Sequence, residues 1–164
     1  MKARVARPDD AAAISVIYNQ GIEDRVATFE VRPRTPDDIH TWFDGKHPVV
    51  VVEDGGSIIA FAATFPYRPR DCYAGIAELS VYVARLHRGR GAGKLALSFL
   101  LEAAERAGFW KVLSRIFPEN LGSRALVRSV GFREVGIYEK HGQLDGVWKD
   151  VIIVERLLLG ACKA

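Results

Sequence analysis

Apolar and polar positions in the first half of the chain alternate with periods that predict short strands and amphipathic helices. Apolar residues recur at helical spacing after Pro8, up to Tyr18. Asp54-Gly55-Gly56 separates two β-rich runs, which is a hairpin signal. The elements predicted in this half are a strand over 3–7, a helix that starts at 8–10, a short helix over 35–43, and antiparallel strands over 49–53 and 57–65.

The second half has the pattern of a strand–helix–strand crossover followed by a helix and two strands. The predicted strands cover 77–83, 111–117, 133–138 and 147–158, and the predicted helices cover 95–107 and 120–130. Gly108 and Gly131 follow the two helices, where glycine commonly ends a helix. A crossover of this kind joins parallel strands, so we expect a mixed α/β sheet with helices on both faces.

Composition limits the class of protein further. With 164 residues and 49% hydrophobic content, we expect one domain over 1–164 with its own core. A net charge of +3 is too small to indicate nucleic acid as a partner. The N-terminus has no signal-peptide core and no apolar run approaches roughly 18 residues, so we expect no export and no membrane span.

Cysteine and histidine give no sign of a metal site. Cys72 and Cys162 are not at a metal-ligand spacing and do not suggest a disulfide framework, which favours a reducing cytoplasm. His40, His47 and His87 have no ligand spacing either, and we interpret them as surface residues.

A basic glycine-rich turn between a predicted strand and a predicted helix is the clearest local motif, at 88–94. Such a turn directs free N–H groups and the positive end of the helix dipole at one point, which favours a phosphate group. Arg88, Arg90 and Lys94 would add positive charge at its rim. A solvated basic turn is the simpler interpretation of a generic motif of this type.

Two other phosphate-binding motifs can be compared with this turn. A P-loop fails, because Arg88 stands where its first glycine belongs and Leu95 where Ser or Thr should follow the lysine. A dinucleotide-binding motif could be formed by Gly91, Gly93 and Ala96, with Glu119 as the ribose-binding acid. The chain offers only one clear βαβ unit, however, which ranks a dinucleotide-binding oxidoreductase below a coenzyme A site.

Arg88-Gly89-Arg90-Gly91-Ala92-Gly93 resembles the Q/R-x-x-G-x-G/A acetyl-CoA motif of the GNAT acetyltransferases. Further motifs in the same order resemble the phosphinothricin acetyltransferase branch of that superfamily; they are 17–19, 27–30, 78–83, 131–132, 140–142 and 148–150. Within the branch, 110–111, 117–120 and 139–142 are most similar to the arsinothricin-resistance N-acetyltransferases.

The resemblance implies the GNAT fold, an α/β (α+β) domain with a mixed central sheet of about six to seven strands and about four flanking helices. It also implies acetyl-CoA as co-substrate, no metal, and a homodimer. The cofactor-binding residues that it implies are Val81, Tyr82 and Val83 beside the pantetheine, Arg88, Gly89, Arg90, Gly91, Ala92, Gly93 and Lys94 at the pyrophosphate, and Asn120. Asn120 could equally be an ordinary N-cap of the following helix.

Amine acetylation requires a base, because an ammonium has no lone pair with which to attack a thioester. The resemblance places this base at Glu78, although a strand glutamate of this kind is more often an exposed partner in a salt bridge. His141 matches a second active-site position of the branch and could relay a proton near neutral pH.

The sequence departs from the branch at two places near these residues. Gln143-Leu144-Asp145 is expected to lengthen the turn after His141. Val127 stands where many members of the branch have Tyr or His, so no general acid is expected from that helix. A thiol with a pKa of about 8.5 is a tolerable leaving group without one.

The substrate is expected to be a glutamate-like amino acid, such as phosphinothricin, arsinothricin or methionine sulfoximine, acetylated on its α-amino group by direct transfer. The resemblance places substrate-binding residues at Arg68, Arg70 and Tyr73, with Tyr18, Thr28 and Phe29 as further walls of the pocket. Guanidinium groups suit carboxylate or phosphinate oxygens, but a solvated loop and ordinary core packing also explain these residues. A CoA-binding sensor without turnover is the non-enzymatic alternative.

Overall fold

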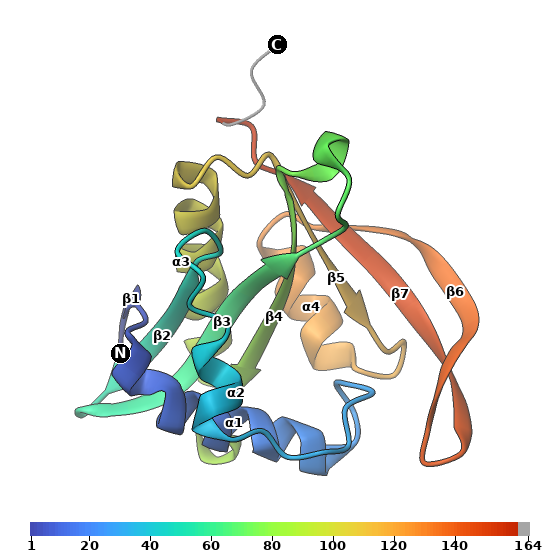
Figure 1. Ribbon diagram of the computed structural model, residues 1–164. Coiled ribbons are helices and arrows are strands. Elements are labelled where there is room, and N and C mark those ends of the chain that lie inside the picture. Colours follow the sequence, from blue (N-terminus) through green and yellow to red (C-terminus); the bar gives the residue numbers. More distant parts are fainter. Residues whose placement is uncertain (161–164) are drawn as a thin grey trace.

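A mixed sheet of seven strands forms the centre of the computed structural model, which describes residues 1–160 (Figure 1). The strands are β1 (Lys2–Val5), β2 (Val49–Asp54), β3 (Ser57–Pro66), β4 (Ile76–Val83), β5 (Lys111–Ile116), β6 (Arg133–Leu144) and β7 (Val147–Leu157). Their order across the sheet is β1-β2-β3-β4-β5-β7-β6. β4 and β5 are parallel and all other neighbours are antiparallel, which confirms the predicted crossover.

Four α-helices cover the two faces of the sheet (Figure 1). α1 (Ala11–Asp24) and α2 (Pro36–His40) pack on one face, where Ile14 and Ile17 of α1 contact Phe61 of β3. α3 (Ala92–Arg106) and α4 (Leu121–Ser129) pack on the other, with Leu97 and Leu100 of α3 in the larger core cluster. The predicted fold class is confirmed. Within residues 1–160, no helix has the length and apolar character needed to cross a membrane.

The sheet divides between β4 and β5. Their parallel pairing covers only Ile76–Glu78 against Lys111–Leu113, whereas β4 remains paired with β3 as far as Val83. The Ser114 hydroxyl donates to the Leu79 carbonyl at 2.9 Å, just beyond the last paired residue. After this point the two strands separate, and one edge of β4 is left without a partner strand.

The last hairpin is longer than the sequence predicted. β6 continues to Leu144 instead of ending at Tyr138, because a bulge absorbs the extra residues between Tyr138 and Gly142 and pairing resumes at Gly142–Lys149. Asp145 and Gly146 then form the turn, both with positive φ, as in the tight turns that join antiparallel strands. Residues 143–145 therefore extend the hairpin, and the expected longer turn was wrong.

Three other sequence predictions need correction. α2 ends at His40, and a turn, in place of further helix, carries the chain through Trp42. α3 begins at Ala92, three residues before the predicted start, since the glycine turn leads directly into it. His47 is not a surface residue: only 7% of its side chain is exposed, and its Nδ1 lies 2.6 Å from Asp44 Oδ2.

Gly75 holds the loop before β4 against Trp110. A Cβ atom at Gly75 would lie 2.1 Å from the Trp110 ring, while the Trp110 amide donates to the Gly75 carbonyl at 2.9 Å. Gly75→Ala should therefore lower the free energy of unfolding by roughly 1–3 kcal/mol through overpacking, as measured by urea denaturation. Gly136→Ala is the control, because its Cβ meets no atom within 4 Å. Equal stability of both variants would contradict this packing.

Candidate functional site

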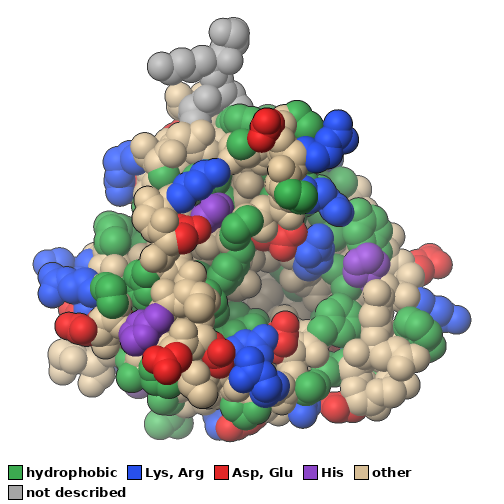
Figure 2. Space-filling view, viewed as in Figure 1, with side chains coloured by type: hydrophobic (Ala, Val, Ile, Leu, Met, Phe, Trp, Pro, Cys, Tyr) green, Lys and Arg blue, Asp and Glu red, His purple; other side chains and the backbone are tan. Residues whose placement is uncertain are grey.

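A cavity of about 380 Å³ lies where β4 and β5 separate. It is bounded by the free edge of β4, by the glycine turn that begins α3, by the N-terminus of α4 and by the end of α1. The lining residues are Gly21, Asp24, Val26, Ala27, Val81, Tyr82, Val83, Arg88, Gly89, Gly91, Gly93, Lys94, Asn120, Gly122, Ser123 and Leu126. Figure 2 shows that the face of the molecule turned to the viewer is hollowed near its centre, with acidic, basic and histidine side chains around the hollow.

The turn before α3 has a backbone that only glycine adopts easily. Gly89 and Gly91 have φ values of +73° and +88°, in the left-handed region. Gly93 is restricted by space, because a Cβ atom there would meet Val83 Cγ2 at 3.2 Å and Leu126 Cδ2 at 3.3 Å. The first intrahelical bond runs from the Leu95 amide to the Gly91 carbonyl, so the preceding N–H groups of the first turn remain free for an anion.

Arg88 lines the cavity, but its charge is paired within the protein, which the sequence did not indicate. Its guanidinium lies 2.6 Å from Asp24 Oδ2 and donates to the Val83 carbonyl at 3.1 Å. Arg85 also bonds Asp24, at 2.7 Å, and its amide donates to Gln20 Oε1 at 2.7 Å. The end of α1 thus holds the segment that precedes the glycine turn.

The charge on Asp24 reflects this arrangement. Burial raises the pKa of the Asp24 carboxyl, but hydrogen bonds from Arg85 and Arg88 outweigh burial and hold the pKa below its ordinary value. The side chains of Arg90 and Lys94 form no hydrogen bond or ion pair with any described residue, and both residues are exposed. They are the cations that remain for an anion at the turn. Arg90 and Ala92 do not line the cavity, and the Ala92 side chain is buried in the core.

The position of Asn120 is compatible with both roles considered from the sequence, as the N-cap of α4 and as a cofactor-binding residue. Its Oδ1 accepts a hydrogen bond from the Ser123 amide at 3.2 Å, which caps α4. The residue also lines the cavity. Because the cap uses Oδ1, the Nδ2 group is left as a donor.

Glu78 is the last residue of β4 that pairs with β5, and 26% of its side chain is exposed. The Arg115 guanidinium donates to Glu78 Oε2 at 3.1 Å. The salt-bridge interpretation of Glu78 is thus correct for this structure, and Arg115 is a residue of the site that the sequence analysis missed. Its only signal was a charged residue within a strand rich in apolar positions.

His141 lies in the bulge of β6 and is exposed. Its ring centroid is 4.7 Å from that of Tyr138, and within residues 1–160 no hydrogen bond or ring contact joins it to Glu78. Val127 of α4 is buried in the core cluster that contains α3, and only 4% of it is exposed. α4 therefore presents no acid at this position.

The residues expected to wall the substrate pocket divide into two groups. Tyr18 and Tyr82 both lie near the Thr28 hydroxyl, and their rings are 5.0 Å apart. Burial raises the pKa of both tyrosines. Phe29 packs on Phe117, with ring centroids 4.9 Å apart. These side chains join the loop after α1 to the sheet, so packing accounts for much of their placement.

The second group lies in the exposed loop between β3 and β4. The Arg68 guanidinium lies over the Tyr67 ring at 5.2 Å, and that of Arg70 over Tyr73 at 5.6 Å. Hydrogen bonding of the Arg68 guanidinium to the Tyr67 oxygen is the main reason that the pKa of Arg68 is raised, and the charge of Glu78 contributes. Arg68 is therefore close enough to Glu78 to interact with it electrostatically.

Comparison with known proteins agrees with this geometry. The family model described as Acetyltransferase (GNAT) family matches residues 18–132. The chain is 31% identical to a phosphinothricin N-acetyltransferase of Streptomyces coelicolor, covering 96% of each chain. It is 30% identical to an L-methionine sulfoximine/L-methionine sulfone acetyltransferase of Salmonella typhimurium, covering 94% of this chain and 93% of that one.

A solved structure extends the comparison to three dimensions. It is a GNAT superfamily phosphinothricin acetyltransferase from Sinorhizobium meliloti in complex with acetyl-CoA. Its TM-score is 0.88 at 30% sequence identity, covering 95% of this chain and 87% of that chain. The chain belongs to the GNAT acetyltransferase family, and it is an acyltransferase.

Asp24 provides a test of how the glycine turn is held. Asp24→Asn removes the charge that binds Arg85 and Arg88, so amide hydrogens of 84–91 should exchange faster, as measured by hydrogen-exchange mass spectrometry. A carboxyl with a lowered pKa stabilises the folded state above its usual pKa, so the difference from wild type should disappear on acidification through the folded-state pKa.

The matched control is Glu23→Gln, whose carboxylate is 65% exposed and lies 3.3 Å from Arg85. Unchanged exchange in 84–91 for both variants would mean that Asp24 does not restrain the turn.

Proposed function

We propose that this protein is an acetyl-CoA-dependent N-acetyltransferase that acetylates the α-amino group of a glutamate-like amino acid. The observation that carries the proposal is the cavity between the free edge of β4 and the N-terminus of α3. It brings unpaired strand amides and free helix amides into one groove, whose first lining residue on β4, Val81, follows Glu78 by three positions.

This groove fits acetyl-CoA. The free edge of β4 at 81–83 can pair with the amides of the pantetheine as an added strand would. The amides of the first turn of α3, with Arg90 and Lys94 nearby, suit the pyrophosphate. Asn120 has a donor available at the opposite wall. Bound there, acetyl-CoA supplies an activated acetyl thioester.

The chain provides charged groups for an amino acid near Glu78. In our proposal the Glu78 carboxylate takes a proton from the substrate ammonium, directly or through water, while Arg68, Arg70 and Tyr73 hold its acidic groups. Tyr18, Thr28 and Phe29 shape the wall of the pocket. The names of the relatives support phosphinothricin and methionine sulfoximine as substrate types, with arsinothricin as a close analogue.

We propose direct transfer in a ternary complex. Among the described residues Cys72 is a free, exposed cysteine in the loop before β4, and no base is bonded to it. Cys162 lies outside the described residues. A covalent acyl-enzyme therefore has little support, and His141 is the second candidate for proton transfer.

The alternatives considered from the sequence have less support. Glu119, which a dinucleotide site would need for ribose, is bonded to Lys149 at 2.6 Å, and within residues 1–160 β4–β5 is the only parallel pair. A CoA-binding sensor would release no thiol when given acetyl-CoA and an amino acid, whereas the proposed enzyme would.

We further propose that the chain acts as one domain and as a homodimer in a reducing cytoplasm. The exposed, apolar β6–β7 hairpin supports the dimer, since Ile137, Val147 and Trp148 are 57%, 58% and 55% exposed. The free Cys72 thiol fits the reducing compartment.

Gly91→Val tests the cofactor site. Valine at a φ of +88° should distort the turn and weaken acetyl-CoA binding at least tenfold, measured by calorimetry. Gly56→Val is a matched control, because Gly56 also has a positive φ, of +82°, and open space, but lies in the β2–β3 turn. Equal acetyl-CoA affinity in the two folded variants would remove the glycine turn from the cofactor site.

Glu78→Gln tests the base. The variant keeps the size of the side chain but not its basicity, so kcat should fall about 10²–10⁴-fold with acetyl-CoA binding unchanged. Raising the pH should restore part of the rate, because more substrate is then already deprotonated. The measurement is a pH profile of kcat/KM, with Glu53→Gln as the control that loses an Arg–Glu pair elsewhere in the sheet. Activity of Glu78→Gln within a few-fold of wild type would move the role to another group, with His141 next.

A further inference from the structure

Arg115 projects from β5 at the point where β4 and β5 separate. Glu78 pairs with Leu113 in the parallel register, and Arg115 follows two residues later on the same face. Glu78 also stands opposite Phe65 of β3, which packs on the cluster beneath α1 and α2. Arg115 and Glu78 thus share the face of the sheet that the loop after α1 covers.

Most hydrogen-bond donors of the Arg115 guanidinium bond no described residue. Its Nη1 donates to Glu78 Oε2 at 3.1 Å, and within residues 1–160 its guanidinium nitrogens make no other hydrogen bond. The side chain is 40% exposed and that of Glu78 is 26% exposed, so neither is sealed from a ligand. Arg68 contributes a second positive charge near Glu78. Within residues 1–160, Arg115 is the cation bonded to this carboxylate, and the charge of Arg68 adds to the positive potential around it.

We infer that Arg115 is a specificity-determining residue that binds the anionic side-chain group of the amino-acid substrate and releases Glu78 to the substrate ammonium. This inference rests on the proposed function. Before substrate binds, Arg115 and Glu78 neutralise one another. When an acidic amino acid binds, its side-chain anion pairs with Arg115 and its ammonium with Glu78, so one ion pair is exchanged for two.

The exchange is favourable for an anionic substrate and not for a neutral one. A partly exposed ion pair contributes little net stability, so opening it costs little. A phosphinate or carboxylate can occupy two donors of the guanidinium fork, which is stronger than the single bond to Glu78. A neutral side chain, such as the sulfone of methionine sulfone, offers no charge to replace Glu78 and leaves the Arg115–Glu78 pair in place. Arg115 should therefore favour acidic side chains.

The test compares Arg115→Gln with wild type on two substrates, phosphinothricin, which carries an anionic phosphinate, and L-methionine sulfone, whose side chain is neutral. We expect the ratio of kcat/KM for phosphinothricin to that for methionine sulfone to fall about tenfold or more, since hydrogen bonds to charged groups discriminate by at least this factor. Most of the loss should appear in the KM for phosphinothricin. Arg115→Lys keeps the charge without the fork and should retain part of the preference.

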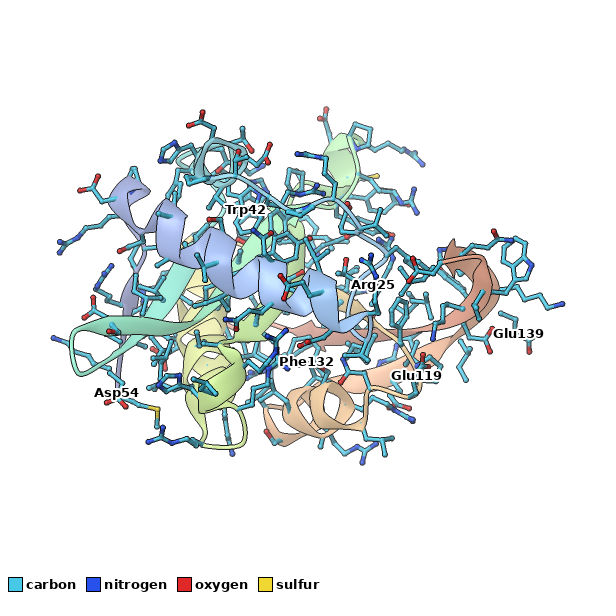
Figure 3. The ribbon with its side chains drawn as sticks, turned by 90° about the horizontal axis from the view of Figure 1, so that it is seen from below. Arg25, Trp42, Asp54, Glu119, Phe132 and Glu139 are labelled. Atoms are coloured by element: carbon cyan, nitrogen blue, oxygen red, sulfur yellow. The ribbon has the colours of Figure 1, made fainter. Side chains whose placement is uncertain are left out.

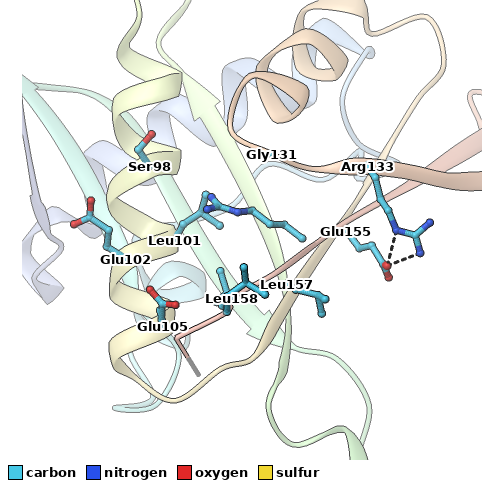
Figure 4. A pocket seen from close by; sticks show the side chains of 11 residues that line it. Ser98, Leu101, Glu102, Glu105, Gly131, Arg133, Glu155, Leu157 and Leu158 are labelled. Carbon is cyan, nitrogen blue, oxygen red and sulfur yellow. Dashed lines mark hydrogen bonds and ion pairs between the residues drawn. The ribbon is translucent and has the colours of Figure 1, made fainter. Parts of the chain in front are cut away.

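The matched control is Arg133→Gln. Arg133 also forms an ion pair with a strand glutamate, Glu155, at 2.7 Å, and it lines a separate cavity between α3 and β7 (Figure 4). Its substrate ratio should equal that of wild type. Thermal unfolding of each variant confirms that the fold is retained.

The outcomes separate this inference from the proposed function. If wild type acetylates neither amino acid, the proposed function fails and the inference fails with it. If wild type acetylates either one and the ratio of Arg115→Gln is unchanged, the inference alone is overturned. If kcat falls equally for both substrates, Arg115 acts only through Glu78 and does not select the substrate.

Discussion

The separation of β4 from β5 beyond Glu78 is the constraint on which the rest of the site depends. While the strands are paired, their backbone groups satisfy one another, and no ligand can enter. Once they separate, β4 keeps β3 on one side and exposes donors and acceptors on the other. A strand edge of this kind is normally a liability in a folded protein. Here the glycine turn and the N-terminus of α4 enclose it, so that it becomes one wall of a cavity.

Features that depend on residues close together in the chain could be predicted from the sequence, and features that depend on distant residues could not. The elements, the hairpin of β2 and β3, the parallel crossover and the glycine turn depend on neighbouring residues, and the sequence pattern indicated each of them. The GNAT family and its co-substrate came from motifs along most of the chain. These features are local, or are repeated in order, and a sequence displays them directly.

The features that the sequence did not indicate depend on residues far apart in the chain. Arg115 meets Glu78 across 37 positions, and neither residue type reveals the other. Arg88 was expected to face the phosphate, but Asp24 at the end of α1 holds its guanidinium. The length of β6 depends on a bulge at 139–141 that allows pairing to resume at Gly142. A period-two pattern does not show such an interruption, since three residues of β6 there stand opposite one of β7 and the alternation resumes in phase beyond them.

The loop after α1 also links two parts of the molecule that the sheet order keeps apart. Arg25, just past the end of α1 (Figure 3), is paired with Asp145 in the turn of the β6–β7 hairpin at 3.1 Å. The next two residues, Val26 and Ala27, line the cavity. A swing of the hairpin tip therefore pulls on the cavity wall as long as this pair is closed. Both side chains of the pair are exposed, at 39% and 58%, so raised ionic strength weakens it and leaves the apolar packing of Phe29 beside Gly142 and Leu144 as the remaining link.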